Sequence, residues 1–385
     1  MKTRILSLAL TVLLALLLCS CGDEVGSLSS DETASPGFTE LSPETQPQTQ
    51  PQTDPLELFV SQMTTEEKVG QMFFVDIPFS GDEQLVADYH LGGVIVSGRH
   101  IADMTSEAIK RYLARVQDCA KIPLLIGADE EGGTVIRISD NPNVRDEQFL
   151  SPKSYYLYGG MDAAIEAETE KAQLLTSLGI NVNLAPVCDV TSDPDSFMYD
   201  RSFSEDPDET AEFVSKTVEV YGNNHYGSTL KHFPGYGDNV DTHEGMAYDA
   251  RSLEELEARD LVPFRAGIRA GADAIMVSHN IVEAMDPDYP ASLSAPVHTY
   301  IRDNMGFTGV IMTDDLVMGA ITEYTDSESS AVVAVKCGND MLCCTDYTTQ
   351  YPAVVEAVQN GEIPEEQINA SVLRILRWKQ RLGLI

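Results

Sequence analysis

Short apolar runs and longer amphipathic segments alternate between residues 70 and 359. The apolar runs are continuous and rich in Val, Ile and Leu, which is typical of strands covered on both faces in a parallel sheet. They span residues 70–77, 93–97, 123–128, 182–187, 228–232, 274–279, 309–313 and 340–344. Helical patterns cover residues 106–120, 163–178, 208–225, 253–270 and 351–359. Eight strand–helix units predict an α/β domain over residues 55–385 that folds as a (β/α)8, TIM-type barrel, with a doubly wound open sheet as the alternative.

The first twenty residues have the pattern of an export signal. Lys2 and Arg4 precede an apolar run over residues 5–18, which is too short for a comfortable membrane span. The small residue before Cys21 resembles the cleavage box of bacterial lipoproteins. We therefore expect a lipoprotein-type signal peptide at residues 1–20, lipidation of Cys21, and anchoring at the extracellular face of the bacterial cytoplasmic membrane. Ordinary secretion is the alternative.

Residues 21–54 differ in composition from the rest of the chain. Residues 22–54 contain no Lys or Arg, and residues 45–53 are a repeat of Gln, Pro and Thr. Such a segment buries too little apolar surface to offset the entropy of ordering it, so we expect a disordered acidic tether. The formal net charge of −36 argues against a nucleic-acid partner.

Polar residues follow several of the predicted strands directly. Asp129 follows the third run, Arg201 lies beyond the fourth, Lys231 and His232 close the fifth, and Asp314 follows the seventh. In a barrel these positions share the C-terminal rim, where active sites are built. We therefore expect them to converge on one pocket.

Asp314 and a downstream pair are the candidates for chemistry. A carboxylate at the mouth of a barrel can attack an electrophilic sugar carbon and form a covalent intermediate. A helix N-cap is the alternative for Asp314, and more so for its neighbour Asp315. The Gly-rich loop over residues 231–243 ends with Asp241 and His243, a carboxylate and an imidazole that can deliver and recover protons near neutral pH.

Five further residues have the character of sugar ligands. Charged hydrogen bonds orient a polar sugar best, and the candidates for substrate binding are Asp129, Arg137, Arg201, Lys231 and His232. A structural ion-pair network is the alternative. The acidic run 129–131 could hold Mg²⁺, but no second acidic cluster of matching spacing occurs, so neither a metal nor another cofactor is predicted.

These motifs together resemble glycoside hydrolase family 3, in particular the single-domain β-N-acetylglucosaminidases (β-N-acetylhexosaminidases) of the NagZ type. The resemblance extends over residues 56–385. It rests on residues 63–72, 129–133, 183–190, 201–203, 231–243 and 313–316. It implies that Asp314 is the nucleophile, that Asp241 and His243 supply the acid/base, and that the five residues named above contact the sugar.

The resemblance also implies a reaction, which is retaining hydrolysis of terminal non-reducing β-linked N-acetylglucosamine from peptidoglycan fragments (muropeptides) or amino-sugar oligomers. Family β-glucosidases typically take a Glu acid/base from a second domain. We expect no such second domain in a chain that ends at Ile385, which favours the N-acetylglucosamine branch of the family. Phosphorolysis, a broader β-glucosidase activity and a non-catalytic sugar-binding lipoprotein are the alternatives. Tyr236 stands where many relatives carry His, and Thr134 where Arg is common, and we expect both to affect subsite preference rather than activity.

Overall fold

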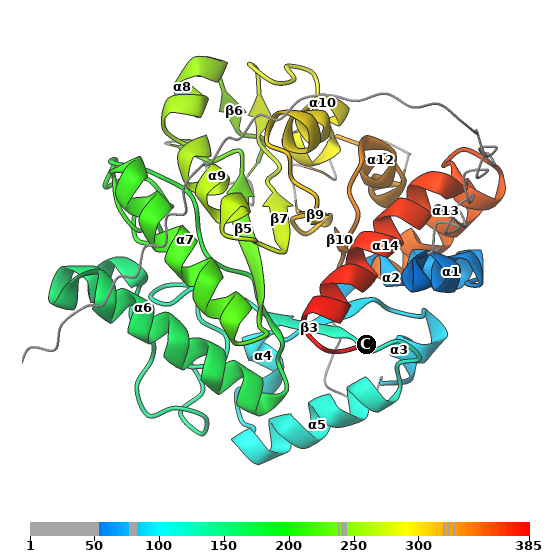
Figure 1. Cartoon of the computed structure of the whole chain (residues 1–385), viewed down its shortest axis with the longest axis horizontal. Coiled ribbons are helices and arrows are strands. Elements are labelled where there is room, and N and C mark those ends of the chain that lie inside the picture. The colour runs from blue at the N-terminus through cyan, green and yellow to red at the C-terminus, as the bar shows by residue number, and fades with distance from the viewer. Residues whose placement is uncertain are drawn as a thin grey trace, which may run out of the picture. The chain divides into compact units, whose positions relative to one another are not determined.

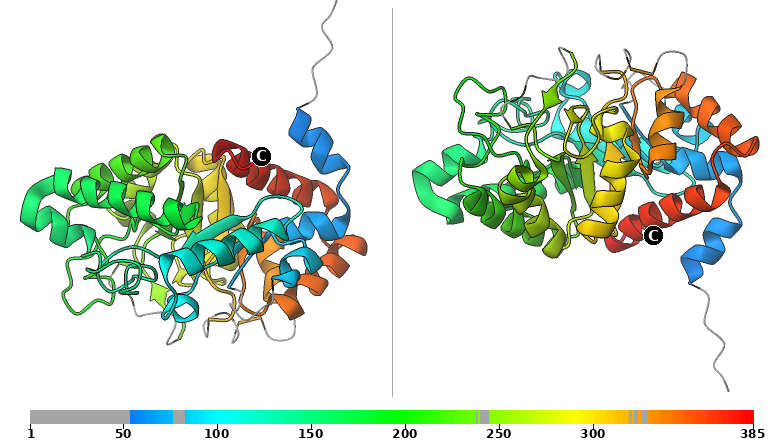
Figure 2. Two further views of the ribbon diagram at one scale, coloured as in Figure 1. Left: turned by 90° about the horizontal axis from the view of Figure 1, so that it is seen from below. Right: turned by 90° about the horizontal axis from the view of Figure 1, so that it is seen from above.

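The structure is a computed structural model that describes residues 54–76, 83–237, 239, 245–318, 321, 324–325 and 329–385. The predicted signal peptide, Cys21 and all of the tether except Asp54 lie outside the described residues. Figure 1 shows short strands at the centre of the described part, and both views in Figure 2 show helices around them.

Eight parallel strands form the central sheet, in the order β10-β1-β2-β3-β4-β5-β7-β9. Their bounds are β1 Phe73–Asp76, β2 Gly93–Ile95, β3 Leu125–Ala128, β4 Val182–Asn183, β5 Gly227–Phe233, β7 Ala274–Val277, β9 Val310–Thr313 and β10 Leu342–Cys343. The two ends of this order also meet. Met312 bridges to Met341, and the Asp340 backbone N–H donates to the Ile311 carbonyl at 2.8 Å. The sheet is therefore a nearly closed barrel, and the open-sheet alternative is wrong.

Seven of the eight predicted apolar runs contain one of these strands, and the remaining run, 228–232, lies within β5. The helices of the described residues are α1 Pro55–Ser61, α2 Thr65–Gln71, α3 Gln84–Asp88, α4 Gly98–Ile101, α5 Ser106–Asp118, α6 Pro152–Leu178, α7 Pro207–Asn223, α8 Leu253–Ala258, α9 Leu261–Arg269, α10 Ala295–Thr299, α12 Ser330–Cys337, α13 Tyr347–Gln359 and α14 Glu365–Arg381. A 3₁₀ turn, Ala291–Leu293, and a π-helical turn, Tyr300–Asn304, flank α10. No described helix is long and apolar enough to span a membrane.

Two predicted helices differ from the structure. The segment predicted at 253–270 is two helices, because the chain leaves helical geometry at Arg259, where φ is −127° and ψ is −72°. Asp260, between the helices, is held instead by Arg251, at 2.6 Å from Nη1 to Oδ2. The helix predicted from 163 begins at Pro152, after the Ser151 N-cap, and it is kinked at Gly160, whose φ is 74°.

The barrel interior is packed around Phe74 of β1. A Cβ added to Gly93 or Gly127, on the two following strands, would lie 2.4 or 2.5 Å from the Phe74 ring. The two glycines therefore provide the space that this ring fills, and they fix where the wide side chain lies in the barrel.

A short ribbon outside the barrel was not predicted. Strand β6, Tyr248–Asp249, pairs in parallel with β8, Ile281–Val282. Each strand has two residues, which is too short for periodicity to indicate it. The ribbon joins the segment after the Gly-rich loop to the segment after β7, so both pass over the C-terminal side of the barrel.

Candidate active site

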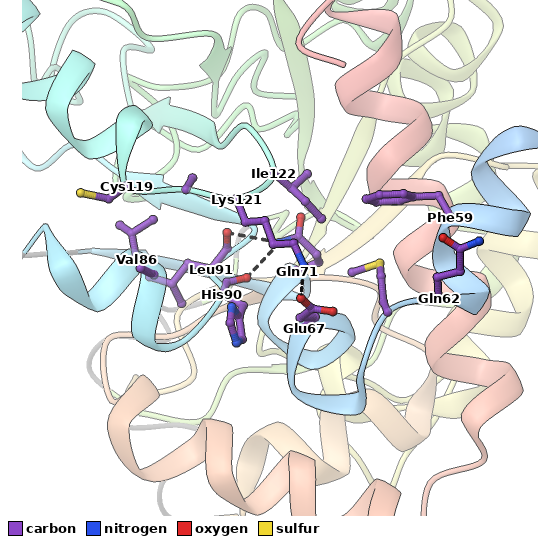
Figure 3. Close-up of a pocket in the computed structure, with 13 residues that line it drawn as sticks. Phe59, Gln62, Glu67, Gln71, Val86, His90, Leu91, Cys119, Lys121 and Ile122 are labelled. Atoms are coloured by element: carbon purple, nitrogen blue, oxygen red, sulfur yellow. Dashed lines mark hydrogen bonds and ion pairs between the residues drawn. The ribbon is translucent and has the colours of Figure 1, made fainter.

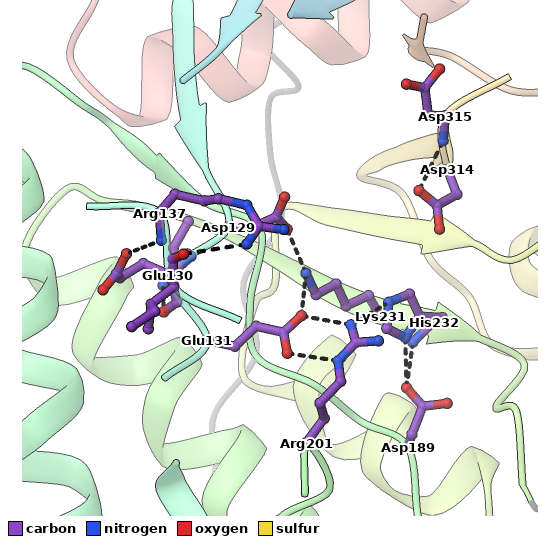
Figure 4. A network of polar contacts seen from close by, with 12 residues as sticks. Asp129, Glu130, Glu131, Arg137, Asp189, Arg201, Lys231, His232, Asp314 and Asp315 are labelled. Carbon is purple, nitrogen blue, oxygen red and sulfur yellow. Dashed lines mark hydrogen bonds and ion pairs between the residues drawn. The ribbon is translucent and has the colours of Figure 1, made fainter. Parts of the chain in front are cut away.

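A cavity of about 530 Å³ lies at the C-terminal ends of the strands. The residues predicted there converge on it from separate strands: Asp129 follows β3, Lys231 and His232 are in β5, and Asp314 follows β9. Arg137 and Arg201 also line it. Figure 4 shows Asp314 on a loop apart from the ion-pair cluster, with which it shares the cavity.

The cluster is centred on Glu131, a buried carboxylate. Arg201 binds it in a bidentate manner, with Nε 2.9 Å from Oε2 and Nη2 2.7 Å from Oε1. The Lys231 ammonium lies 2.7 Å from Glu131 Oε1 and 2.7 Å from Asp129 Oδ1. Burial would raise the pKa of Glu131, but the two cations outweigh it and hold that pKa far below its usual value. Glu131 is therefore a permanent anion between two cations.

His232 continues this network to Asp189. The Arg201 Nη2 atom lies 3.0 Å from His232 Nε2, and a guanidinium can only donate, so Nε2 accepts. The ring proton is then on Nδ1, which donates to Asp189 Oδ2 at 2.8 Å. Asp189 also accepts the Tyr236 backbone N–H at 2.8 Å. One carboxylate therefore fixes the imidazole and the start of the Gly-rich loop.

Asp314 lies where β9 ends. Its backbone N–H donates to the Val277 carbonyl at 3.2 Å, and its Oδ1 accepts the Asp315 N–H at 2.8 Å. Burial would raise the pKa of Asp314, but nearby His279 and His232, together with this N–H donor, keep the pKa below its usual value. The carboxyl group is thus ionised at neutral pH, as a nucleophile must be.

Asp315 holds a turn together. Its carboxylate accepts the backbone N–H groups of Val317 and Thr345, each at 3.2 Å, and also the Thr345 hydroxyl. Buried His279 holds the same turn from the other side, with Nε2 3.0 Å from the Asp315 carbonyl and Nδ1 2.7 Å from Ser292 Oγ. His279 is therefore a structural residue that stabilises the turn after Asp314.

The three acids of the 129–131 run serve three purposes. Asp129 meets Lys231, and Glu131 meets Arg201 and Lys231, whereas Glu130 accepts backbone N–H groups of residues 137–139 and so shapes the loop that carries Arg137. Lys231 thus neutralises Asp129 and Glu131 together, whereas Glu130 has a structural role. The described residues hold no group of three or more candidate metal ligands.

Several residues of the site were not predicted. Glu131 and Asp189 belong to the motifs quoted above, but only the fold reveals their partners. Asp76, at the end of β1, lines the cavity with Arg99 and pairs with it, and burial raises the pKa of Asp76 despite that cation. Phe197 packs edge-on against Tyr236, with ring centroids 5.0 Å apart, and both line the cavity. No sequence signal marks Phe197.

Two predicted catalytic residues, Asp241 and His243, lie outside the described residues. Of the two departures from the family pattern, Tyr236 is buried and lines the cavity, whereas Thr134 is exposed and is not among the residues that line it.

A second pocket, shown in Figure 3, has a different character. Its volume is about 320 Å³, and it lies at the N-terminal ends of the first strands, between α1, α2, α3 and α5. Its lining is mostly apolar, and its charged Lys121 and Glu67 pair with each other. The N-terminal face of such barrels serves stability, so the first cavity is the candidate active site.

The profile of the glycosyl hydrolase family 3 N-terminal domain matches residues 64–378. A beta-hexosaminidase of Xylella fastidiosa strain M23 is 36% identical over 240 residues, which cover 61% of this chain and 70% of that protein. Beta-hexosaminidase A of Pseudoalteromonas piscicida is 28% identical over 368 residues, covering 83% of this chain and 62% of that protein.

A solved structure is also similar. The glycoside hydrolase family 3 beta-N-acetylglucosaminidase from Paenibacillus sp. str. FPU-7 matches with a TM-score of 0.78 and 32% identity, over 84% of this chain. This chain covers 63% of that protein, which is less than two thirds of its length.

Proposed function

Because this chain belongs to glycosyl hydrolase family 3, we propose that it is a β-N-acetylhexosaminidase that hydrolyses terminal, non-reducing β-linked N-acetylglucosamine with retention of configuration. The observation that carries the proposal is the ionised Asp314 carboxylate in one cavity with Asp129, Arg201, Lys231 and His232. The beta-hexosaminidase relatives and the beta-N-acetylglucosaminidase structure support the choice of substrate.

In the first step, an Asp314 oxygen attacks the anomeric carbon and the glycosidic bond breaks. His243 gives its proton to the departing oxygen, and Asp241 stabilises the imidazolium form of His243. In the second step, His243 takes a proton from water, the hydroxide displaces the Asp314 ester, and the sugar leaves with its β configuration. In the sequence the pair follows the Gly-rich segment, whose described start Asp189 anchors through the Tyr236 backbone N–H.

The ion-pair cluster binds the sugar. Lys231 is held between two carboxylates and Arg201 by a bidentate contact, so both cations present their remaining N–H groups in fixed directions. Asp129 is partly exposed and offers an acceptor for sugar hydroxyls. Arg137 adds a guanidinium at the cavity wall.

We place the enzyme outside the cell membrane. Cleavage of the export signal before Cys21 and lipidation of that residue would leave the barrel on a tether over residues 21–54, close to peptidoglycan fragments or amino-sugar oligomers. Metabolic labelling with a fatty-acid analogue, comparing the parent with Cys21→Ala, tests this. Label on the variant would contradict the anchor.

The activity test is release of 4-nitrophenol from its β-N-acetylglucosaminide and from its β-glucoside, each in phosphate and in phosphate-free buffer. The parent should cleave the first substrate faster and yield free sugar in both buffers. Asp314→Asn should fall to background, whereas the matched control Asp315→Asn should retain turnover, because an amide oxygen still accepts the N–H groups of the turn. A preference for the glucoside, or sugar 1-phosphate as the product, would contradict the proposal.

A further inference from the structure

A second polar cluster adjoins the ion pairs of the catalytic cavity and has no role in the mechanism above. It consists of Lys171 and Glu168 of α6, Tyr221 of α7 and Asn183 of β4. Each of these residues is at most 2% exposed, and none of them lines the catalytic cavity. They therefore do not touch the substrate, and any effect on the reaction has to pass through another residue.

Lys171 joins this cluster to the catalytic one. Its Nζ atom donates to Glu168 Oε1 at 2.6 Å and to the backbone carbonyl of Glu131, also at 2.6 Å. Glu131 is the residue whose carboxylate binds both Arg201 and Lys231. A buried ammonium thus holds the backbone of the residue whose side chain holds two cations in the cavity.

The chain after Glu131 is shaped around that ammonium. Gly132 has a φ of 99°, which a residue with a side chain rarely adopts. A Cβ added there would lie 2.3 Å from the Leu150 carbonyl oxygen and 3.3 Å from Lys171 Nζ. Glycine therefore allows the backbone to turn directly against Lys171, and this close fit fixes where the Glu131 carbonyl lies.

The other half of the cluster holds the neighbouring residue. Tyr221 OH donates to the second Glu168 oxygen at 2.6 Å and accepts from Asn183 Nδ2 at 3.0 Å. Asn183 in turn binds both backbone groups of Glu130, with Nδ2 3.0 Å from its carbonyl oxygen and Oδ1 3.0 Å from its amide nitrogen. The cluster therefore holds two successive residues of the acidic run, one from α6 and one from β4.

Stability alone does not account for this arrangement. Burying an ammonium and a carboxylate is costly, and apolar side chains of similar volume often stabilise a protein as well or better. An ammonium on a helix, with its carboxylate three residues away on the same helix, has a fixed direction, because each contact meets a set acceptor. What the pair of Lys171 and Glu168 adds is therefore a defined position for the Glu131 backbone.

That position matters for sugar binding. Lys231 lies 2.7 Å from both Glu131 and Asp129. Arg201 binds the Glu131 carboxylate with two nitrogens. A shift of the Glu131 backbone would move this carboxylate and, with it, both cations. None of these contacts includes Asp314, so the nucleophile would keep its own contacts.

We propose that Lys171 is a positioning residue for substrate binding, which acts through the Glu131 backbone to fix the ion-pair cluster that meets the terminal sugar. Glu168 keeps the ammonium in place. This inference rests on the proposed function. Since the cluster binds the sugar in the ground state as well as in the transition state, disturbing it should raise KM more than it lowers kcat.

The test measures kcat and KM for 4-nitrophenyl β-N-acetylglucosaminide and, by calorimetry, the affinity for N-acetylglucosamine. Lys171→Met should raise KM and weaken sugar binding roughly three- to tenfold, the range that one hydrogen bond typically contributes, with kcat within about twofold of the parent. The matched control is Lys379→Met, because Lys379 is also fully buried but contacts Gln71, at 2.7 Å, on the N-terminal side of the barrel. This control should leave KM unchanged.

A second pair of variants keeps the test decisive if Lys171→Met does not fold. Tyr221→Phe removes the hydroxyl that links Glu168 to Asn183, and it should raise KM about two- to fivefold. Tyr226→Phe is its control, since the two tyrosine rings lie 5.2 Å apart and the Tyr226 hydroxyl has no hydrogen-bond partner among the described residues. The control should match the parent.

Parental KM and sugar affinity in both Lys171→Met and Tyr221→Phe would overturn the inference, and so would a loss confined to kcat or an equal rise of KM in the controls. If the parent cleaves no N-acetylglucosaminide, the proposed function fails instead, and hydrogen exchange of a peptide containing residues 129–133 decides whether Lys171 positions this run. Exchange should then be faster in Lys171→Met and Tyr221→Phe than in the parent and unchanged in the two controls. Equal exchange in all of these proteins would overturn the inference.

Discussion

Glu131→Gln should destabilise the protein strongly, because it removes the carboxylate that contacts both Arg201 and Lys231. Each of the two 2.7 Å contacts corresponds to about 6 kcal/mol of attraction at an effective dielectric constant of ~20. Much of that sum is offset by the cost of desolvating the carboxylate, and glutamine still accepts a hydrogen bond. Loss of one member of a buried ion pair typically costs about 3–5 kcal/mol, against a total stability of about 5–15 kcal/mol.

The assay is urea denaturation at pH 7, and the matched control is Glu212→Gln. Glu212 pairs with Lys216 at 3.4 Å on the exposed face of α7, so its loss should cost no more than about 0.5 kcal/mol. The pKa of Glu131 is lower in the folded state than in the unfolded state. The ionised carboxylate therefore contributes its full stabilisation above the pKa of the unfolded state, and this stabilisation is lost as the pH falls below it. The difference between the parent and Glu131→Gln should therefore stay constant from pH 8 to pH 5 and shrink below pH 4. A loss of stability at pH 7 no larger than that of Glu212→Gln would show that the buried carboxylate does not stabilise the fold.

Two further predictions concern the barrel itself. Burial lowers the pKa of Lys379, which contacts Gln71 at 2.7 Å, to about 7, so the folded state binds fewer protons than the unfolded state between pH 7 and pH 10. The unfolding free energy of the parent should then rise by about 2–3 kcal/mol from pH 7 to pH 9 relative to that of Lys379→Met. If urea denaturation gave the same change between the two pH values for both proteins, the prediction would be wrong. Gly127→Ala should cost about 1–3 kcal/mol in urea denaturation, because its Cβ would lie 2.5 Å from the Phe74 ring. Gly222→Ala, where the nearest atom would be 3.9 Å away, should stabilise helix α7 by about 0.5–1 kcal/mol, and equal effects of the two substitutions would show that the barrel interior has space.

The barrel could be predicted from the sequence because its strands are buried on both faces and therefore appear as continuous apolar runs. The break between α8 and α9 was overlooked rather than hidden: the chain leaves helical geometry at Arg259, four residues before Pro263, whose ring clashes with the carbonyl at that position and which fits only the first turn of a new helix. The β6–β8 ribbon was missed because two-residue strands have no period.

The candidate site was predictable as a set of residues and not as a network. Rim residues such as Asp129, Lys231 and Asp314 are recognisable because each directly follows or ends an apolar run. The central position of Glu131 in the ion-pair network could not be predicted, because its partner Arg201 is 70 positions away and comes from another loop. Asp315 shows the same limit, since its role as a turn acceptor depends on Thr345 beyond β10.

The central claim is that Asp314 forms a covalent bond to the sugar. The most direct measurement is mass spectrometry of His243→Ala, mixed with 4-nitrophenyl β-N-acetylglucosaminide, quenched in acid and digested. Without its base the variant should accumulate the glycosyl-enzyme, since the good leaving group departs without an acid while water attacks slowly. One N-acetylhexosaminyl ester is expected on the peptide that contains Asp314, and none when Asp314→Asn is added. An adduct on a different residue, or continued turnover with no adduct, would contradict it.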